Sequence, residues 1–511
     1  MLRRYREIAD KWIAQLVGRT GWVPLVLLGI VALTLGAVVH RHGLNFAAGA
    51  DESGYLHNVR LIREGRLYTE VRPIADLPKS ELRRRYYQPL GLQTSEDRER
   101  QAPMYAFGFP VLVAAVETVT GVEPDTALQW ALMLIAMAAP LLVYALAREL
   151  ELDPGWALVA AAAVAASPMT VFMAQRPMSD LWSLDLACVA AFAGLRSARS
   201  WGWGATLGVA VSWALLTRVT NVLLLPMIVV AVMRYRRLPR HWWGIPLAAL
   251  PGCLVLMWLN QELYGSPWRT GYVRVTALFN AEHFWPTLRH YGWWIWVLVG
   301  PALVGGFLLL PTMIKRWPWR VALVGSWVVV VTGFYCFYSF SSQTWWYTRF
   351  LLPVFPAITL GGAWVWQRWA RRSGDAAGVL IVIVVLLGSL VWSWRWNQKI
   401  VPFWDPSQDS YVLMEQWLTA RSEPADLFVC GQTSGSLYYQ MPNPILRFED
   451  LRTVDWKVVV ESARRAGIDV YAVLFRHEAE DQAVLIEKIP GEWEPVASLS
   501  DVRIFKLQPA G

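Results

Sequence analysis

The chain has 511 residues, with 47 lysines and arginines against 39 aspartates and glutamates, and its formal net charge is +8. Hydrophobic residues make up 55% of it, and 31 residues are tryptophan. So much apolar surface excludes a single soluble domain. The apolar residues lie in long blocks without an amphipathic period, which is typical of membrane spans.

The first block, Trp22 to Val39, follows a group of basic residues and is long enough to cross a bilayer. It exceeds the apolar core of a cleaved signal peptide, which favours a signal anchor. The later apolar blocks are Met104 to Thr120, Ala127 to Ala147, Trp156 to Ala174, Leu181 to Leu195, Ala205 to Leu216, Val222 to Met233, Trp243 to Leu259, Gly292 to Leu310, Val321 to Phe340, Leu351 to Trp366 and Ala376 to Trp394.

Basic residues fall in every second short loop, and the positive-inside rule places those loops in the cytoplasm. The loops hold Arg196 and Arg199, Arg234 to Arg240, Lys315 to Arg320, and Arg368 to Arg372. The resulting topology puts the N-terminus inside and the long loop 40–103 outside, so only one of the next two blocks crosses. We assign that crossing to Ala127 to Ala147 and predict an interfacial helix over 104–120. About eleven spans follow, and the number changes by two if the short blocks Ala205 to Leu216 and Val222 to Met233 do not cross.

After Trp394 the composition changes to mixed charged and apolar segments with turn residues. We predict a membrane module over 1–396 and a small, soluble, extracytoplasmic α/β domain over 397–511. The predicted elements are helices at Ser410 to Ala420 and Asp455 to Ala466, and strands at Leu427 to Cys430, Ile468 to Leu474, Trp493 to Ser498 and Val502 to Leu507.

Two adjacent acids, Asp51 and Glu52, follow the first span and lie at the outer surface of the membrane in this topology. A carboxylate near a low-dielectric boundary can accept a proton from an incoming hydroxyl. An acidic pair at this point also suits the cap of the amphipathic helix that follows, so both interpretations stay open.

Another acid, Asp180, opens a span from the same outer face, directly after Ser179. Its alternative role is again that of a helix cap. Asp185 lies about one turn deeper, where a charged group is costly unless it is functional or paired.

Arg218 and Arg349 fall at the outer ends of spans, where arginine is uncommon. A guanidinium grips a phosphate through two hydrogen bonds, so both are candidates for holding a lipid phosphate. An interfacial arginine beside an aromatic belt is the competing interpretation.

The order of these motifs on one face resembles that of the GT-C superfamily of integral membrane glycosyltransferases, in the branch of the protein O-mannosyltransferases and the lipid A aminoarabinose transferases. The residues that carry the resemblance are Asp51 and Glu52, Gly65 at the end of the helix that follows them, Ser179 and Asp180, the turn Arg218 to Asn221, the loop Gly265 to Tyr272, and the segment Tyr347 to Pro353.

The resemblance implies a polytopic α-helical fold, a sugar donor linked to polyprenyl phosphate, and inversion at the anomeric carbon. It matches Asp51 to the general base of the family, with Glu52 as its neighbour, and Asp180 to the second outer acid. The roles of Arg218 and Arg349 rest on their chemistry alone. Three tyrosines of the same motifs are predicted to bind substrate: Tyr55, Tyr272 and Tyr347.

The predicted reaction moves a sugar to a hydroxyl of a glycolipid, glycan or protein at the outer face of a bacterial inner membrane. No cofactor is required by the sequence. Some relatives hold a divalent metal, and that question is left open because no metal-ligand set is recognisable here. The cytoplasmic loops account for the basic residues, so no nucleic-acid partner is expected.

Two other classes of function fit part of the pattern. A transporter of an anionic or lipid-linked solute would also carry charges at span ends, but it is expected to show repeated halves, and none is visible. A membrane scaffold without catalytic activity is the second alternative.

Overall fold

The computed structural model describes residues 21–234, 241–272, 278–401, 406–480 and 488–508. The chain forms two compact units. Unit 1 comprises Met1–Gly43, Leu128–Leu256 and Arg274–Pro402, and unit 2 comprises Leu44–Ala127, Met257–Val273 and Phe403–Gly511. The predicted basic group before the first span, and most of the basic loop after Arg234, lie outside the described residues.

Within the described ranges, six helices are long and apolar enough to cross a membrane. They are α2 (Trp22–His42), α5 (Pro124–Glu149), α11 (Gly244–Tyr264), α14 (Pro318–Tyr335), the continuous segment of η6 (Trp345–Val354) with α15 (Phe355–Ala370), and α16 (Asp375–Ile400). A bent pair, α6 (Pro154–Ala166) with α7 (Pro168–Ala174), makes a seventh if it counts as one span. The count of about eleven spans therefore stays a prediction.

Proline and glycine explain why several predicted blocks are not single long helices. Pro168 follows a 57° bend between α6 and α7, and Gly300 with Pro301 separates α12 (Phe284–Val299) from α13 (Pro301–Leu308). The shorter helices of unit 1 are α8 (Asp180–Arg196), α9 (Trp201–Thr217), η2 (Val219–Leu224), α10 (Leu225–Val232) and η5 (Leu310–Met313).

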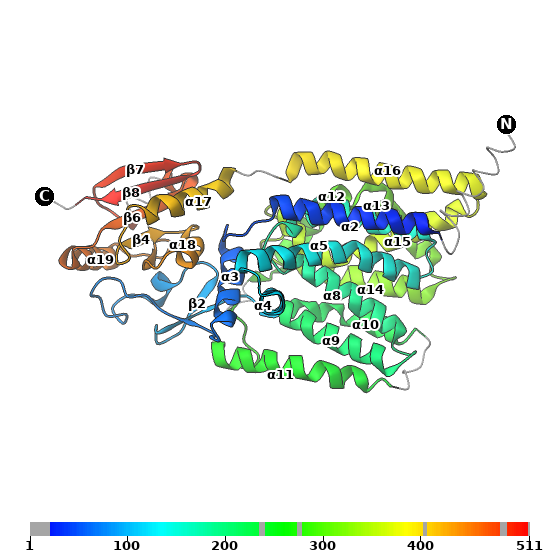
Figure 1. Ribbon diagram of the computed structural model, residues 1–511, viewed down its shortest axis with the longest axis horizontal. Coiled ribbons are helices and arrows are strands. Elements are labelled where there is room, and N and C mark those ends of the chain that lie inside the picture. The colour runs from blue at the N-terminus through cyan, green and yellow to red at the C-terminus, as the bar shows by residue number, and fades with distance from the viewer. Residues whose placement is uncertain (1–20, 235–240, 273–277, 402–405, 481–487, 509–511) are drawn as a thin grey trace. The chain divides into compact units, whose positions relative to one another are not determined.

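Helix α6 is buried in unit 1 and packs against α2, α15 and α16. These three neighbours of α6 are labelled in Figure 1. Every residue from Pro154 to Ala165 is buried, and half of them are alanine. Small side chains let neighbouring backbones approach closely in a membrane protein. The same principle acts between α13 and α15, where a Cβ on Gly362 would lie 2.2 Å from the Leu303 carbonyl oxygen.

On another side of unit 1, α8 packs against α9, α10 and η6, and α10 packs against α14. These four contacts bring the N-terminus of α8, the α9–η2 junction and η6 together, and they position the candidate residues of this unit.

In unit 2, the predicted interfacial segment forms α4 (Gly108–Thr120), which packs against α3 (Ala50–Arg63). Helix α4 has 13 residues, and at 1.5 Å per residue it is too short to cross a bilayer core of about 30 Å. The part of the chain that connects the two helices forms η1 (Arg84–Tyr87) and a small sheet of β1 (Thr69–Glu70), β3 (Arg100–Pro103) and β2 (Leu92–Thr94).

The C-terminal residues of unit 2 form a five-stranded sheet in the order β5-β4-β6-β8-β7. Its strands are β5 (Ile445–Arg447), β4 (Leu427–Cys430), β6 (Val470–Phe475), β8 (Val502–Leu507) and β7 (Trp493–Leu499). Strand β4 is parallel to both of its neighbours, β5 and β6, and β8 is antiparallel to both of its neighbours, β6 and β7. Helix α19 (Thr453–Ala466) packs in the core on one face, and α17 (Pro406–Thr419) and α18 (Ser434–Gln440) pack on the other. A short helix, α20 (Arg476–Glu480), follows β6.

Strands β4 and β8 begin and end at the predicted residues, and the other predicted helices and strands of this region agree with the structure within a few residues. Strand β5 and helices α18 and α20 were not predicted. That this region is a separate extracytoplasmic domain stays a prediction.

Candidate active site

In unit 1, the loop before α8 ends at Ser179, and Asp180 is the first residue of the helix. The Ser179 side chain makes no capping hydrogen bond to its own helix. Its Oγ instead accepts a hydrogen bond of 3.0 Å from Nε of Arg218. The serine thus helps to fix the arginine.

Arg218 ends α9 in an extended conformation, which separates that helix from η2. Its Nη2 lies 2.9 Å from Oδ1 of Asp180, whose side chain is fully buried. Asn221, which follows Arg218 in the chain, donates a hydrogen bond of 3.2 Å to Ser183, which follows Asp180 in α8. Asp180 and Arg218, which the sequence predicts as an acid and a phosphate ligand, therefore form an ion pair. Neighbouring polar contacts hold this pair in place.

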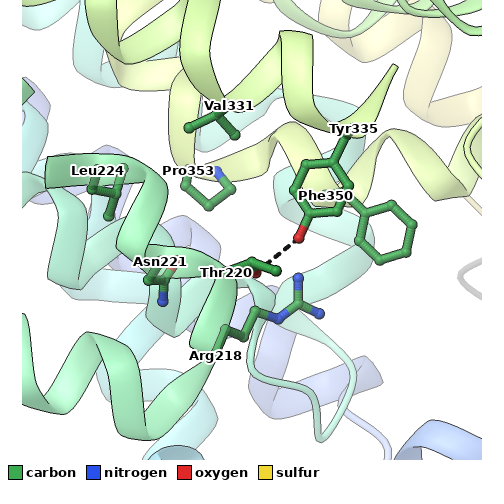
Figure 2. Close-up of a pocket in the computed structure, with 8 residues that line it drawn as sticks. All are labelled: Arg218, Thr220, Asn221, Leu224, Val331, Tyr335, Phe350 and Pro353. Atoms are coloured by element: carbon green, nitrogen blue, oxygen red, sulfur yellow. Dashed lines mark hydrogen bonds between the residues drawn. The ribbon is translucent and has the colours of Figure 1, made fainter. Parts of the chain in front are cut away.

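A small pocket opens beside Arg218 (Figure 2). Its lining residues are Arg218, Thr220, Asn221, Leu224, Val331, Tyr335, Phe350 and Pro353. The Tyr335 hydroxyl donates a hydrogen bond of 2.9 Å to Oγ1 of Thr220, and the Tyr335 ring stacks on Phe350 with centroids 5.0 Å apart. The pocket thus combines a cation, two hydroxyls and an aromatic wall.

Arg349 comes from η6 and is buried. Its guanidinium lies 5.3 Å from the ring centroids of Trp346 and Phe350 and 5.8 Å from that of Tyr347, and Nη1 lies 3.4 Å from Sδ of Met178. Phe350 is also 5.8 Å from the Arg218 guanidinium. The two predicted phosphate ligands therefore lie near the same aromatic ring.

The deeper acid of α8, Asp185, is also fully buried. Neither of its carboxyl oxygens has a hydrogen-bond partner among the described residues.

In unit 2, Asp51 and Glu52 both lie in the first turn of α3, where the helix dipole favours negative charge. Glu52 is buried, and Asp51 is half-buried. Asp51 Oδ1 accepts a hydrogen bond of 2.5 Å from the hydroxyl of Tyr105, a residue between β3 and α4. Of the two acids, Asp51 is the more accessible to an acceptor hydroxyl.

Tyr105 is fixed against α3 from several directions. A Cβ on Gly54 would lie 2.3 Å from the Tyr105 ring, so the missing side chain makes room for the ring. Asn58 Nδ2 donates a hydrogen bond of 2.9 Å to the Tyr105 carbonyl. Burial, with the Asp51 carboxylate beside it, raises the pKa of Tyr105 well above its usual value, so the phenol keeps the proton that it donates.

Two of the tyrosines predicted to bind substrate lie around Tyr105. The Tyr55 ring is 4.9 Å from the Tyr105 ring and the Tyr272 ring is 6.2 Å from it. Sequence reasoning missed Tyr105 itself, because it lies in no recognised motif and 54 residues separate it from Asp51. The third predicted tyrosine, Tyr347, lies beside Arg349 in unit 1.

His57 lies on α3 with its ring against Tyr438 and Tyr439. Burial, followed by the charges of Arg60, Arg72 and Arg66, lowers its pKa from 6.5 to about 3. We expect folding stability to be lost as the pH falls from 6.5 towards 3, because the unfolded chain binds a proton that the folded chain excludes.

At about 1.4 kcal/mol per pKa unit, this loss amounts to several kcal/mol. The measurement is the unfolding midpoint of unit 2 at pH 7 and pH 4, in the wild type and in His57→Phe, which keeps a ring without a titratable nitrogen. An equal decrease in both proteins would contradict the assignment.

The described residues contain no group of three or more histidines, cysteines, aspartates or glutamates placed to hold a metal ion. The question of a divalent metal therefore stays open.

No protein-family model matches this chain, and no curated protein matches it. Solved structures do resemble it. ArnT from Cupriavidus metallidurans bound to undecaprenyl phosphate is 13% identical, with a TM-score of 0.59 over 95% of this chain and 98% of that one. The arabinofuranosyltransferase AftD from Mycobacteria is 14% identical, with a TM-score of 0.56 over 95% of this chain and 40% of AftD.

The third structure is the oligosaccharyltransferase AglB from Archaeoglobus fulgidus in complex with an inhibitory peptide and a dolichol-phosphate. It is 11% identical, with a TM-score of 0.54 over 94% of this chain and 74% of that one. All three are GT-C glycosyltransferases. The predicted resemblance is thus confirmed at the level of the fold.

Proposed function

We propose that this protein is an inverting glycosyltransferase that moves a sugar from a polyprenyl-phosphate donor to a hydroxyl of a cell-envelope acceptor. The observation that carries the proposal is the pair of buried or nearly buried arginines, Arg218 and Arg349, whose guanidinium groups lie 5.8 Å and 5.3 Å from the centroid of the Phe350 ring. Support comes from the shared fold, since ArnT was solved with undecaprenyl phosphate and AglB with a dolichol-phosphate.

In the proposed reaction, the acceptor oxygen attacks the anomeric carbon from the side opposite the phosphate. The bond from that carbon to the phosphate oxygen breaks, and its electron pair leaves with the polyprenyl phosphate. Asp51 takes the proton of the acceptor hydroxyl as general base. Tyr105 is a positioning residue, because its hydroxyl holds the Asp51 carboxylate in one orientation.

The arginines are proposed to bind the phosphate in the donor and to stabilise its charge as it leaves. Asp180 is proposed to orient Arg218 through their ion pair. Glu52, which is buried beside Asp51, is assigned a supporting role in the first turn of α3.

Arg349→Ala is expected to raise the apparent KM for the donor by about 10- to 100-fold, because a hydrogen bond to a charged group contributes about 1.5–3 kcal/mol. The measurement is steady-state transfer at varied donor concentration. Arg289→Ala, which removes an exposed arginine of α12, is the control for loss of charge. An unchanged KM in Arg349→Ala would remove that residue from the donor site.

The experiment that tests the function is release of polyprenyl phosphate from a panel of polyprenyl-phosphate sugars. It uses purified full-length protein in lipid, with membrane extract as the source of acceptor. Release that depends on the extract is the expected result, and the active donor identifies the sugar. Folded protein that releases nothing from any donor would contradict the proposal and favour a transporter or a scaffold.

A further inference from the structure

Within unit 2, helix α18 of the C-terminal sheet region lies directly against α3. A Cβ on Gly435 of α18 would lie 2.4 Å from the Leu90 carbonyl oxygen and 2.5 Å from Oγ of Ser53 on α3. The Leu90 amide also donates a hydrogen bond of 3.1 Å to Oγ of Ser434. Only a glycine at position 435 permits this approach.

The segment around Leu90 touches α3 in the same way. Gly91 has a φ of +88°, and a Cβ there would lie 2.3 Å from the Ala50 carbonyl oxygen. Ala50 is the first residue of α3 and directly precedes Asp51. Backbone contacts therefore connect α18, through residues 90–91, to the turn that carries the proposed base.

Two arginines hold the other end of α18. Arg60 of α3 donates a hydrogen bond of 2.7 Å to the Tyr439 carbonyl. Arg72 donates to three carbonyls, those of Tyr438 at 2.8 Å, Met441 at 2.6 Å and Asn443 at 2.9 Å. The last carbonyls of a helix have no partner within it and carry partial negative charge, so guanidinium groups are favourable there.

The rings of α18 complete this contact. The Arg60 guanidinium lies 4.0 Å from the centroid of the Tyr439 ring, and that of Arg72 lies 3.7 Å from the centroid of the Tyr438 ring. The Tyr438 hydroxyl donates a hydrogen bond of 3.1 Å to the Glu70 carbonyl. The contact is thus made of backbone, charge and aromatic interactions over the length of a short helix.

We propose that α18 is a positioning element for catalysis: it holds α3 so that Asp51 points at the acceptor, with Gly435 and Arg72 as positioning residues. The inference rests on the proposed function for its catalytic consequence. It gives the C-terminal region a role within unit 2, which is to hold the helix that carries the proposed base.

The test compares Gly435→Ala with Gly491→Ala in the full-length protein. A Cβ at Gly491 would come closest to Cδ1 of Leu507, at 2.6 Å, which is the end of a side chain that can move, and its other contacts are at ordinary distances. Hydrogen exchange of residues 50–63 is measured without substrate, beside that of β6. We expect exchange in α3 to rise about tenfold or more in Gly435→Ala alone, with β6 unchanged, and kcat to fall with an unaltered donor KM.

Arg72→Lys is the second variant, in case Gly435→Ala does not fold. A lysine keeps the charge but has one nitrogen in place of the two, Nη1 and Nη2, that bond these carbonyls, so a smaller change in the same direction is expected. Unchanged exchange in α3, or equal changes in α3 and β6, would overturn the proposal. If the wild type transfers no sugar, the proposed function fails, while the exchange result still decides whether α18 holds α3.

Discussion

Asp51→Asn is expected to lower the kcat of sugar transfer by about 10²- to 10⁴-fold, the usual contribution of a general base. The asparagine keeps the shape of the side chain and a hydrogen-bond acceptor for Tyr105, but it does not take up the proton of the acceptor. The measurement is single-turnover release of polyprenyl phosphate at saturating donor.

The matched control is Asp125→Asn. Asp125 is an exposed acid in the first turn of α5, so this variant repeats the loss of a first-turn charge away from Tyr105. Tyr105→Phe should reduce kcat less than Asp51→Asn does, because it frees the carboxylate without removing it. Full activity in Asp51→Asn would transfer the role of base to another residue.

Arg218→Ala is expected to destabilise unit 1 by about 3–5 kcal/mol, the cost of leaving a buried charge without its partner. The Asp180 side chain is 0% exposed and that of Arg218 is 15% exposed, so the Asp180 carboxylate loses its main charged partner in a buried setting. The double variant Asp180→Asn, Arg218→Gln removes both charges and should recover most of the loss. The measurement is unfolding in detergent by heat.

A suitable control is Arg371→Ala, which breaks an ion pair with Asp153 where the arginine side chain is 60% exposed. Surface pairs contribute about 0–1 kcal/mol, so little change is expected. If the single and double variants of the buried pair were equally unstable, the destabilisation would come from lost packing and not from the charge of Asp180.

Much of the helical fold could be predicted from the sequence, because apolar blocks are long and their ends are marked by charge. The block Trp156 to Ala174 is predicted as one apolar segment. The bend at Ser167 and Pro168 is missing from that prediction, because hydropathy carries no information about bends. Helix α18 has the sequence SGSLYYQ, which lacks an apolar period. Its helical state comes from packing against α3 and the sheet, which are distant in the chain.

In the candidate site, too, residue types could be predicted from the sequence, but the contacts between distant residues could not. Asp180 and Arg218 were identified separately, from residue type and topology, but their ion pair depends on the packing of α8 against α9. Tyr105 could not be predicted, because its role depends on Gly54 leaving room for the ring. Asp51, Gly54 and Asn58 are spaced as one face of α3, but nothing in the sequence indicates that Tyr105, 47 residues from Asn58 and 54 from Asp51, packs against that face.

The burial of α6 on every side has a consequence for how this protein changes in evolution. Helix α6 touches protein all round, whereas only 28% of the most apolar part of α16 and 17% of that of α11 are buried inside the protein. We expect substitutions in α16 and α11 to be constrained mainly by solubility in lipid, so that leucine, isoleucine, valine and phenylalanine replace one another at most positions. In α6 the constraint is volume, and each alanine there accepts little beyond glycine or serine.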